Sequence, residues 1–349
     1  MKRRISKTIN VRGVPVGGGN PISVQSMTNT RTDDVDATLA QIRRLEAAGC
    51  QIVRLAVPNR LAAAALGDIR RGTDMPLVAD IHFDYTLALA AVEAGFDKIR
   101  INPGNIGSPE RVRLVADACR DRGVPIRVGV NSGSVEKELL EKYGLCARAL
   151  SESALGHVKL LEDCGFEDIC ISVKASDPAL MVETNRLLAQ SCDYPLHIGV
   201  TEAGTLRRGI LKSAAGIGSL LLDGIGDTIR VSLTDDPAEE VAAGLELLRA
   251  LGLRGGVQFI SCPTCGRTEY DLIGTAKEVE ARLRDKPWDI TVAVMGCVVN
   301  GPGEASHADY GIAGGKGEGV IFKHGVSVRR VPEAELADAL VELIESENR

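Results

Sequence analysis

Eight short apolar runs are spaced through the first two thirds of this chain of 349 residues, and amphipathic stretches of helical character lie between them. Several of these stretches start at Asp-Pro or Ser-Pro and stop at Gly, as helices do. The runs begin near Ile22, Ile52, Leu77, Lys98, Ile126, Ile169, Leu196 and Thr228. The stretches include 36–48, 85–94, 109–121, 178–190, 205–221 and 237–251. Eight strand–helix units in about 250 residues predict a (β/α)8 TIM barrel.

The spacing of the runs is irregular at one place, between the fifth and the sixth. There, residues 135–143 and 151–162 predict two helices, which we interpret as an insertion on an outer loop. A doubly wound sheet is the alternative fold, but it would place a Gly-rich phosphate-binding turn after the first strand. Gly17, Gly18 and Gly19 precede that strand and predict an ordinary turn. We therefore expect a barrel domain over residues 1–254.

The pattern changes at residue 255, where strands no longer alternate regularly with helices. The change predicts a smaller α+β domain over residues 255–349. Its predicted elements are strands at 256–260 and 290–295, helices at 272–284 and 332–345, a Gly-rich segment at 311–319 and a hairpin at 319–328.

The composition narrows the class of protein. A formal net charge of −6 argues against nucleic acid or an anionic membrane as a main partner. No apolar run approaches the roughly 20 residues that span a bilayer, and the basic N-terminus lacks the apolar part of a signal peptide. We expect a cytoplasmic protein, in which disulfides are rare. Of nine cysteines, six stand singly among apolar neighbours and are predicted to be small buried residues. These six are Cys50, Cys119, Cys146, Cys164, Cys170 and Cys192.

The other three cysteines form a pattern. Cys262 and Cys265 lie in the run Ser-Cys-Pro-Thr-Cys-Gly-Arg, and Cys297 lies in Met-Gly-Cys-Val-Val-Asn-Gly-Pro-Gly-Glu, which ends at Glu304. Each run follows a predicted strand, so the thiols should project from strand ends on tight turns. Zinc would complete four ligands with Glu304 or His307, whereas an iron–sulfur cluster would carry a carboxylate on one iron. Such a hard ligand on a soft centre is one that a substrate oxygen could displace.

Charged side chains stand near the carboxyl ends of the predicted barrel strands, where the active sites of such barrels lie. Five bases outnumber the two acids Asp80 and Glu202 by three, so these acids cannot neutralise them all. The surplus predicts a bound polyanion, most simply a phosphate or diphosphate. The bases are Arg54, Arg100, Arg127, Lys174 and Arg230.

Polar residues accompany these bases. His82, Asn102, Asn131 and Ser232 suit oriented hydrogen bonds to a small hydroxylated ligand. Asp80 and Glu202 are candidates for proton transfer or hydroxyl binding, with a structural ion pair as the equal alternative. His82 could be a general acid or an ordinary histidine at a strand end, and we expect His197 to pack internally or behind the ligand-binding groups.

Several runs together resemble the family of 4-hydroxy-3-methylbut-2-enyl diphosphate synthases, over the whole chain and in order. They are Val-Gln-Ser-Met-Thr-Asn-Thr, Ala-Asp-Ile-His-Phe, Arg-Ile-Asn-Pro-Gly-Asn-Ile-Gly, Arg-Val-Gly-Val-Asn-Ser-Gly-Ser, Ser-Val-Lys-Ala-Ser, His-Ile-Gly-Val-Thr-Glu-Ala-Gly and the two cysteine runs. The resemblance implies the bacterial two-domain form, a TIM barrel followed by a small α+β iron–sulfur domain resembling the sulfite/nitrite reductase domain. It also implies a [4Fe-4S] cluster on Cys262, Cys265 and Cys297, with Glu304 on the fourth iron.

The resemblance further implies the substrate and the roles of the barrel residues. The substrate would be 2-C-methyl-D-erythritol 2,4-cyclodiphosphate, reductively opened and dehydroxylated to 4-hydroxy-3-methylbut-2-enyl diphosphate. The residues holding the diphosphate would be Arg54, Arg100, Arg127, Asn131, Lys174 and Ser232. Those near the carbon skeleton would be Asp80, Asn102 and Glu202, which with His82 and Glu304 make up the candidate catalytic set.

The expected partners and the rival functions follow. Flavodoxin or ferredoxin would supply single electrons, and two chains would form a head-to-tail homodimer. One rival is a non-redox lyase or aldolase that acts on a phosphorylated substrate and carries a structural zinc site. The other is an iron–sulfur sensor without turnover.

Overall fold

The computed structural model describes residues 2–297, 303 and 305–348, and the chain divides into two compact units. The first unit is Met1–Leu247 and the second is Leu248–Arg349. The division falls within helix α10 (Pro237–Ala250), a few residues before the boundary expected after residue 254. Each unit is described by itself.

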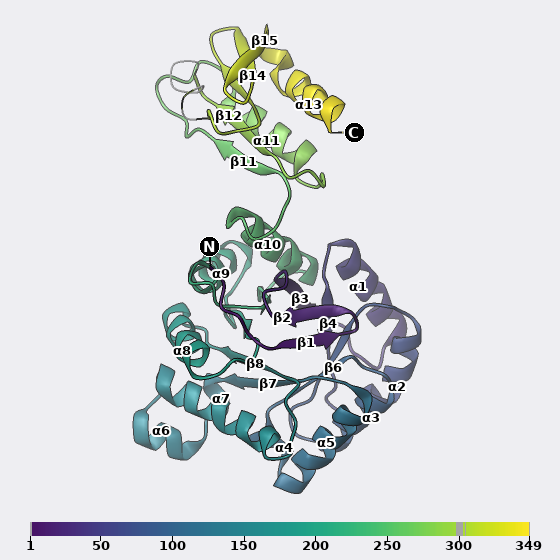
Figure 1. Cartoon of the computed structure of the whole chain (residues 1–349). Coiled ribbons are helices and arrows are strands. Elements are labelled where there is room, and N and C mark those ends of the chain that lie inside the picture. The colour runs from purple at the N-terminus through teal and green to yellow at the C-terminus, as the bar shows by residue number, and fades with distance from the viewer. Residues whose placement is uncertain (1, 298–302, 304, 349) are drawn as a thin grey trace. The chain divides into compact units, whose positions relative to one another are not determined.

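The first unit is built on eight parallel strands (Figure 1). Along the sheet they run in the order β8-β7-β6-β5-β4-β3-β10-β9, and a bridge between Ile171 and Leu196 brings β8 against the start of β9, so that the ring is nearly closed. The TIM barrel is therefore confirmed. The strands are β3 (Ser23–Met27), β4 (Ile52–Ala56), β5 (Leu77–Asp80), β6 (Lys98–Ile101), β7 (Ile126–Asn131), β8 (Ile169–Lys174), β9 (His197–Ile198) and β10 (Thr228–Ile229).

Helices form the outer layer of the barrel and follow the predicted stretches closely. Side chains of Asp34, Asn59, Asp84 and Asp177 cap four of them by accepting hydrogen bonds from first-turn amides. No helix in the described part of the chain is long and apolar enough to cross a membrane. Besides α10, the helices are α1 (Val35–Ala47), α2 (Arg60–Arg71), α3 (Tyr85–Glu93), α4 (Pro103–Ile106), α5 (Pro109–Arg122), α6 (Lys137–Tyr143), α7 (Ala147–Glu162), α8 (Pro178–Ser191) and α9 (Leu206–Leu222).

An antiparallel hairpin precedes the barrel and was not predicted. Its strands β1 (Thr8–Val11) and β2 (Val14–Gly17) bury three apolar side chains against residues near the beginnings of barrel strands. The cluster comprises Ile9, Val11, Val16, Ile52, Val78 and Cys170. The hairpin therefore covers the amino-terminal end of the barrel, which leaves the carboxyl ends of the strands to form the open mouth.

In the described part of the second unit, a five-stranded sheet carries two helices on one face. The helices α11 (Leu272–Leu283) and α13 (Leu336–Glu347) pack against the sheet in one apolar cluster that includes Leu283, Val292, Ile312 and Leu340. The strands, in sheet order, are β11 (Gln258–Ser261), β12 (Thr291–Met295), β13 (Tyr310–Gly314), β14 (Glu318–Lys323) and β15 (Val326–Pro332). The likeness to the sulfite/nitrite reductase domain stays a prediction.

Two details of the second unit differ from expectation. Part of the Gly-rich segment at 311–319 is the regular strand β13, where a Cβ at Gly314 would lie 2.1 Å from the Tyr270 ring. Glycine serves close packing there and does not mark a loop. The last helix begins at Leu336 and not at 332, because β15 continues to Pro332.

The six single cysteines divide into two groups. Cys50, Cys119 and Cys170 are buried as predicted, and burial raises the pKa of the Cys50 thiol to about 11 and that of Cys119 to about 12. The other three are only half-buried, because they lie at helix ends on the outside of the barrel. These are Cys146, Cys164 and Cys192.

Candidate functional site

A cavity of about 180 Å³ opens among the side chains at the carboxyl ends of the barrel strands. This volume lies below the ~300–1,000 Å³ of sites for drug-sized ligands and suits a compact molecule. The cavity brings together all six predicted diphosphate-binding residues and two of the five candidate catalytic residues. Its lining is Arg54, Asp80, His82, Arg100, Arg127, Gly129, Val130, Asn131, Ser172, Lys174, Thr201, Arg230 and Ser232.

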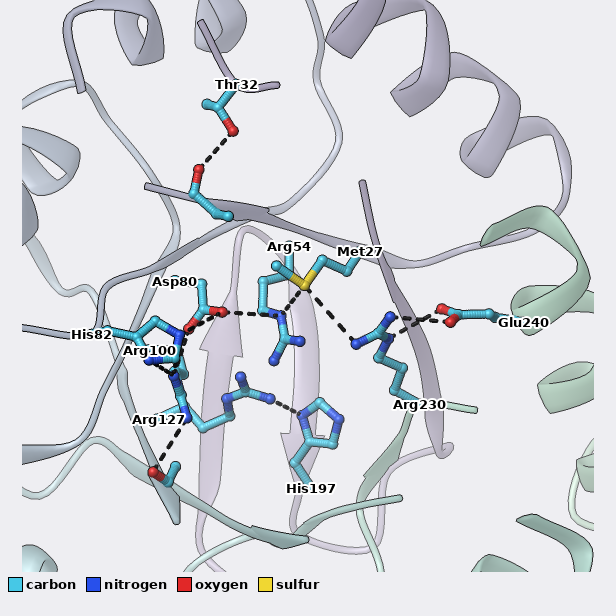
Figure 2. A network of polar contacts seen from close by, with 12 residues as sticks. Met27, Thr32, Arg54, Asp80, His82, Arg100, Arg127, His197, Arg230 and Glu240 are labelled. Atoms are coloured by element: carbon cyan, nitrogen blue, oxygen red, sulfur yellow. Dashed lines mark hydrogen bonds and ion pairs between the residues drawn. The ribbon is translucent and has the colours of Figure 1, made fainter. Parts of the chain in front are cut away.

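Asp80 is the one carboxylate in the lining of this cavity, and it faces two guanidinium groups (Figure 2). Its Oδ1 accepts a hydrogen bond from Arg100 Nη1 at 2.9 Å, and its Oδ2 lies 3.8 Å from Arg54 Nε. Burial alone would raise the pKa of this carboxyl, but Arg54, the contact with His82 and Arg100 outweigh burial. The pKa of Asp80 is therefore held well below its usual range, and the group stays ionised.

His82 stands at the rim, with about half of its side chain exposed. Its Nε2 lies 3.0 Å from Arg100 Nη1. The same nitrogen lies 3.6 Å from Asp80 Oδ2, so His82 stands beside both members of the Arg100–Asp80 pair. His82 is thus placed to touch a ligand in the cavity and to exchange a proton with it.

Arg230 is paired with a residue from outside the lining. Glu240, on α10, accepts from Arg230 Nε and Nη2 at 3.1 Å each and also from Ser26 Oγ at 3.0 Å. The thioether of Met27 lies between two cations: Arg54 Nε donates to its sulfur at 3.0 Å, and Arg230 Nη1 lies 3.9 Å away. Figure 2 shows the sulfur between the two guanidinium groups. Glu240 and Met27 thus fix the direction of Arg230 and Arg54.

Three bases, the buried Arg127 and Lys98 and the half-buried Lys174, have no carboxylate within ion-pairing distance among the described residues. Arg127 is almost completely buried and donates from Nη1 to Nδ1 of His197 at 2.8 Å, so His197 is neutral and carries its proton on Nε2. Burial, followed by repulsion from other bases, lowers the pKa of Arg127 and Lys174 well below their usual values. Burial also lowers the pKa of the deeper Lys98 to about 8. The surplus of positive charge that the sequence predicts is therefore present, and it favours an anionic ligand.

The remaining candidate catalytic residues lie outside the cavity lining. Asn102 is buried, and its Oδ1 accepts from Gly104 N at 3.1 Å at the start of α4, while its Nδ2 has no partner among the described residues. Glu202 is exposed, has a left-handed backbone (φ 52°) and pairs with no base in the described part of the chain. Of the two alternatives for Glu202, the structural ion pair is not found among the described residues, and Glu240 pairs with Arg230 instead. Glu304 lies outside the described residues.

The cysteine turns stand at the ends of two neighbouring parallel strands of the second unit. Cys262 follows β11, and its amide donates to Val294 O on β12 at 3.0 Å, whereas Cys297 comes two residues after β12. A Cβ at Gly296 would lie 3.7 Å from Cys262 Sγ, so the backbone just before Cys297 passes beside the first thiol. Backbone and side-chain hydrogen bonds from Arg267 lower the pKa of the exposed Cys265 thiol.

The donor set fits an iron–sulfur cluster. Among the described residues, no three His, Cys, Asp or Glu side chains converge on one point as zinc requires, and His307 is exposed. A four-iron cluster takes each thiolate on a different iron, so its ligands surround a volume and need not converge. Three thiols on adjacent strand ends, one of them with a lowered pKa, fit that requirement.

Glu240 is the functional residue that the sequence reading missed. Its signal was a carboxylate on the apolar face of a predicted helix, four residues before Gly244 and eight before Leu248, both of which pack inward. Met27 gave no such signal, because a methionine at a strand end usually belongs to the core.

Comparisons with known proteins cover both units. A family model described as the GcpE TIM-barrel domain matches residues 6–245, and one described as the GcpE protein C-terminal domain matches 258–346. The protein named 4-hydroxy-3-methylbut-2-en-1-yl diphosphate synthase (flavodoxin) of Geobacter sulfurreducens is 60% identical over 342 residues, covering 97% of each chain. The protein of that name from Clostridium acetobutylicum is 57% identical over 348 residues, covering 99% of this chain and 100% of its own.

Two solved structures resemble this chain over 71% of its length. The dihydropteroate synthase of Stenotrophomonas maltophilia gives a TM-score of 0.52 at 16% identity, covering 71% of this chain and 97% of that one. The enzyme of the same name from Burkholderia cenocepacia gives 0.51 at 17% identity, with 71% and 98% covered. At such identities the likeness shows the fold only. The shared name of the close relatives gives no support to the lyase or aldolase alternative.

Proposed function

The chain belongs to the GcpE family of 4-hydroxy-3-methylbut-2-en-1-yl diphosphate synthases, and from this premise we propose how its barrel cavity and cysteine turns share the reaction. The enzyme reductively opens 2-C-methyl-D-erythritol 2,4-cyclodiphosphate and removes a hydroxyl group, forming 4-hydroxy-3-methylbut-2-enyl diphosphate and water. The reaction consumes two electrons, which come from flavodoxin, the donor that the relatives' name specifies.

The cavity of five cations around one carboxylate is the observation that carries the proposal for substrate binding. Arg54, Arg100, Arg127 and Lys174 hold the cyclic diphosphate, and Arg230 joins them. Asn131 and Ser232 add hydrogen bonds at the rim. When the ring C–O bond breaks, negative charge develops on the phosphate oxygen, and the fixed guanidinium groups stabilise that charge without having to reorient.

We assign different roles to the two titratable groups beside Arg100. Asp80 is held ionised by its neighbours, so it cannot deliver a proton, and we propose that it orients Arg100 and accepts a hydrogen bond from a substrate hydroxyl. His82 is half-exposed and in contact with Arg100, which makes it the better candidate to protonate the departing hydroxyl. Asn102 and Glu202 stay candidates for contacts with the carbon skeleton.

The cofactor in this proposal is one [4Fe-4S] cluster per chain. Cys262, Cys265 and Cys297 would each bind one iron, and Glu304 would bind the fourth. When bound, the cluster supplies single electrons and a Lewis-acidic iron that is not held by a thiolate. The protein's own part is to keep the three thiols at neighbouring strand ends, with backbone amides around them.

Anaerobic purification and a turnover assay test this function. We expect a brown protein with iron and acid-labile sulfide that consumes the cyclodiphosphate with reduced flavodoxin, or with dithionite and a viologen mediator. A colourless protein that contains zinc and no iron would overturn the cluster assignment. A brown protein that leaves the cyclodiphosphate untouched would favour a sensor.

We further propose that two chains form a head-to-tail homodimer, in which the cluster unit of one chain serves the barrel of the other. The test is a mixture of a barrel variant, Arg127→Met, and a cluster variant, Cys297→Ser, dissociated, reassembled together and assayed at a substrate concentration too low for Arg127→Met to turn over by itself. If a site combines two chains, each mixed dimer would regain one of its two sites, and a random mixture, in which about half of the dimers are mixed, would regain about a quarter of the wild-type activity. If each site lies within one chain, no activity returns.

A further inference from the structure

Two glycines, one on a barrel strand and one directly after a strand, lie against cations of the cavity, and neither has the left-handed backbone that demands glycine. Gly129 is on β7, and a Cβ there would stand 2.4 Å from Arg100 Nε, 2.9 Å from Nη2 and 3.0 Å from Cζ. Contacts this short do not occur between real side chains. The missing side chain, and not the backbone conformation, is therefore what the structure needs at Gly129.

The register of the sheet explains why Arg100 lies over this glycine. Arg100 on β6 is paired with Arg127 on β7, so Gly129 is the next residue of β7 that faces the barrel interior. The Arg100 side chain leans across β7, and its Nη2 donates to Gly129 O at 3.4 Å, while Nη1 reaches back to Asp80 Oδ1 on β5 at 2.9 Å. Only 9% of Arg100 is exposed, and the cavity that it lines is the space into which a displaced guanidinium would move.

We propose that Gly129 is a positioning residue for the reaction: its empty side-chain position sets the direction in which Arg100 presents its guanidinium to the diphosphate. This inference rests on the proposed function of the cavity. A methyl group at Gly129 would push the guanidinium away from Asp80 and into the 180 Å³ that the ligand occupies. The substrate would then meet both a smaller site and a misdirected cation.

Gly199, which follows β9, repeats the arrangement for a second cation. A Cβ there would stand 2.9 Å from Lys174 Nζ, but also 2.5 Å from the backbone oxygen of Arg230. A substitution at Gly199 would disturb the backbone as well as the cation. Gly129 is the cleaner test, because all three of its nearest atoms belong to one side chain.

Gly129→Ala is the test variant, and Gly156→Ala is its control. Gly156 is exposed on α7, and a Cβ there meets no atom within 4 Å. We expect Gly129→Ala to raise the KM for the cyclodiphosphate and the Kd for inorganic pyrophosphate at least tenfold. The visible spectrum and iron content should stay those of the wild type. Gly156→Ala should match the wild type in every measurement.

A double-mutant cycle decides whether Gly129 acts through Arg100. In an Arg100→Ala background the guanidinium is absent, so adding Gly129→Ala should change kcat/KM less than twofold. An equal loss in both backgrounds, or wild-type KM in Gly129→Ala, would overturn the inference. If Gly129→Ala alone fails to fold but the double variant folds, the collision with Arg100 is established. If neither folds, a role specific to Arg100 is refuted.

The same assays separate this inference from the proposed function. If the wild-type protein itself binds neither pyrophosphate nor the cyclodiphosphate, the function of the cavity is wrong. If the wild type binds and turns over while Gly129→Ala does so equally well, only the positioning role is wrong.

Discussion

The Glu240 carboxylate accepts two hydrogen bonds from the Arg230 guanidinium, in which Nε and Nη2 each lie 3.1 Å from a different carboxylate oxygen. The same carboxylate also accepts from the Leu233 amide at 3.0 Å, so a helix on the outside of the barrel orients a cation inside it. Arg230 Nη1 takes no part in the fork and points toward Met27. Glu240 therefore neutralises the charge of Arg230 and leaves Nη1 of the guanidinium directed toward the cavity.

Glu240→Gln should both destabilise the protein and weaken substrate binding. Removing one charge of a buried pair costs about 3 kcal/mol, the low end of the ~3–5 kcal/mol range, because the amide keeps part of the hydrogen bonding. That loss lowers the midpoint of thermal unfolding by roughly 6–12 °C for a unit of this size. Glu239→Gln is the matched control, since Glu239 is the exposed neighbour on the same helix. Equal midpoints in the two variants would contradict the role of Glu240.

Arg127→Met should have effects of opposite sign on stability and on binding. Arg127 is buried, and no carboxylate neutralises it among the described residues, so an apolar replacement removes a desolvation penalty and should raise the thermal midpoint without ligand. The lost charged hydrogen bonds should weaken binding of the cyclodiphosphate about 10- to 150-fold, which corresponds to ~1.5–3 kcal/mol.

Arg70→Met provides the contrast for that experiment. Arg70 lies in the same unit with about 10% of its side chain exposed, and it is paired with Asp97 at 2.8 Å, away from the cavity. This variant should lower the thermal midpoint and leave binding unchanged. If Arg127→Met also lowers the thermal midpoint, Arg127 stabilises the fold and is not a cation kept unpaired to bind the ligand.

The barrel could be predicted because each of its strands is buried on both faces and so reads as a continuous apolar run. The hairpin of β1 and β2 could not, since residues 8–17 alternate apolar with polar residues and end in glycines, as a disordered tail also does. Its role as a cover for one barrel end depends on contacts between Ile9 or Val11 and residues more than 40 positions away. Local pattern carries no information on such contacts.

The cations of the site were predictable for a related reason. A base within an apolar strand is expensive to bury, so its presence in the sequence already indicates a partner. The identity of that partner was not predictable. Glu202 and Glu240 each come after a barrel strand in the sequence, and only the packing of α10 brings Glu240 against Arg230. The same holds for Gly129, whose function depends on where Arg100 lies.

Lys174 should make substrate binding depend on pH. Burial, followed by repulsion from Arg230, Arg54 and Arg127, lowers the pKa of Lys174 in the free protein, and a bound diphosphate should raise it again. Above the lowered pKa, binding must then take up a proton, so affinity should fall as pH rises, by up to about tenfold per pH unit. The two ring phosphates are both esterified and keep a constant charge, so this slope reports on the protein.

Lys174→Arg is the control for the pH dependence, because a guanidinium keeps its proton over the whole range. Titration calorimetry in two buffers of different ionisation enthalpy should show proton uptake by the wild type and less by Lys174→Arg. Lys98→Met measures how much of the proton uptake comes from the deeper lysine. Burial lowers the pKa of Lys98 to about 8. A wild-type affinity that is constant from pH 7 to well above the lowered pKa would contradict the prediction.

Cys297→Ser and Glu304→Ala should distinguish the residues that retain the cluster from the residue that is needed for turnover. Three thiolates bind iron strongly, whereas a carboxylate is a hard ligand on a soft centre and contributes little to retention. Cys297→Ser should therefore be nearly colourless, while Glu304→Ala should keep much of its iron and visible absorbance and lose most turnover. Cys164→Ser is the control, because Cys164 is a half-buried barrel cysteine that donates to the Leu160 carbonyl, as a serine can. Equal iron content and equal rates in Cys297→Ser and Glu304→Ala would contradict this prediction. The cysteine and the carboxylate would then contribute alike to cluster retention and to turnover, and Glu304 would not be the replaceable ligand.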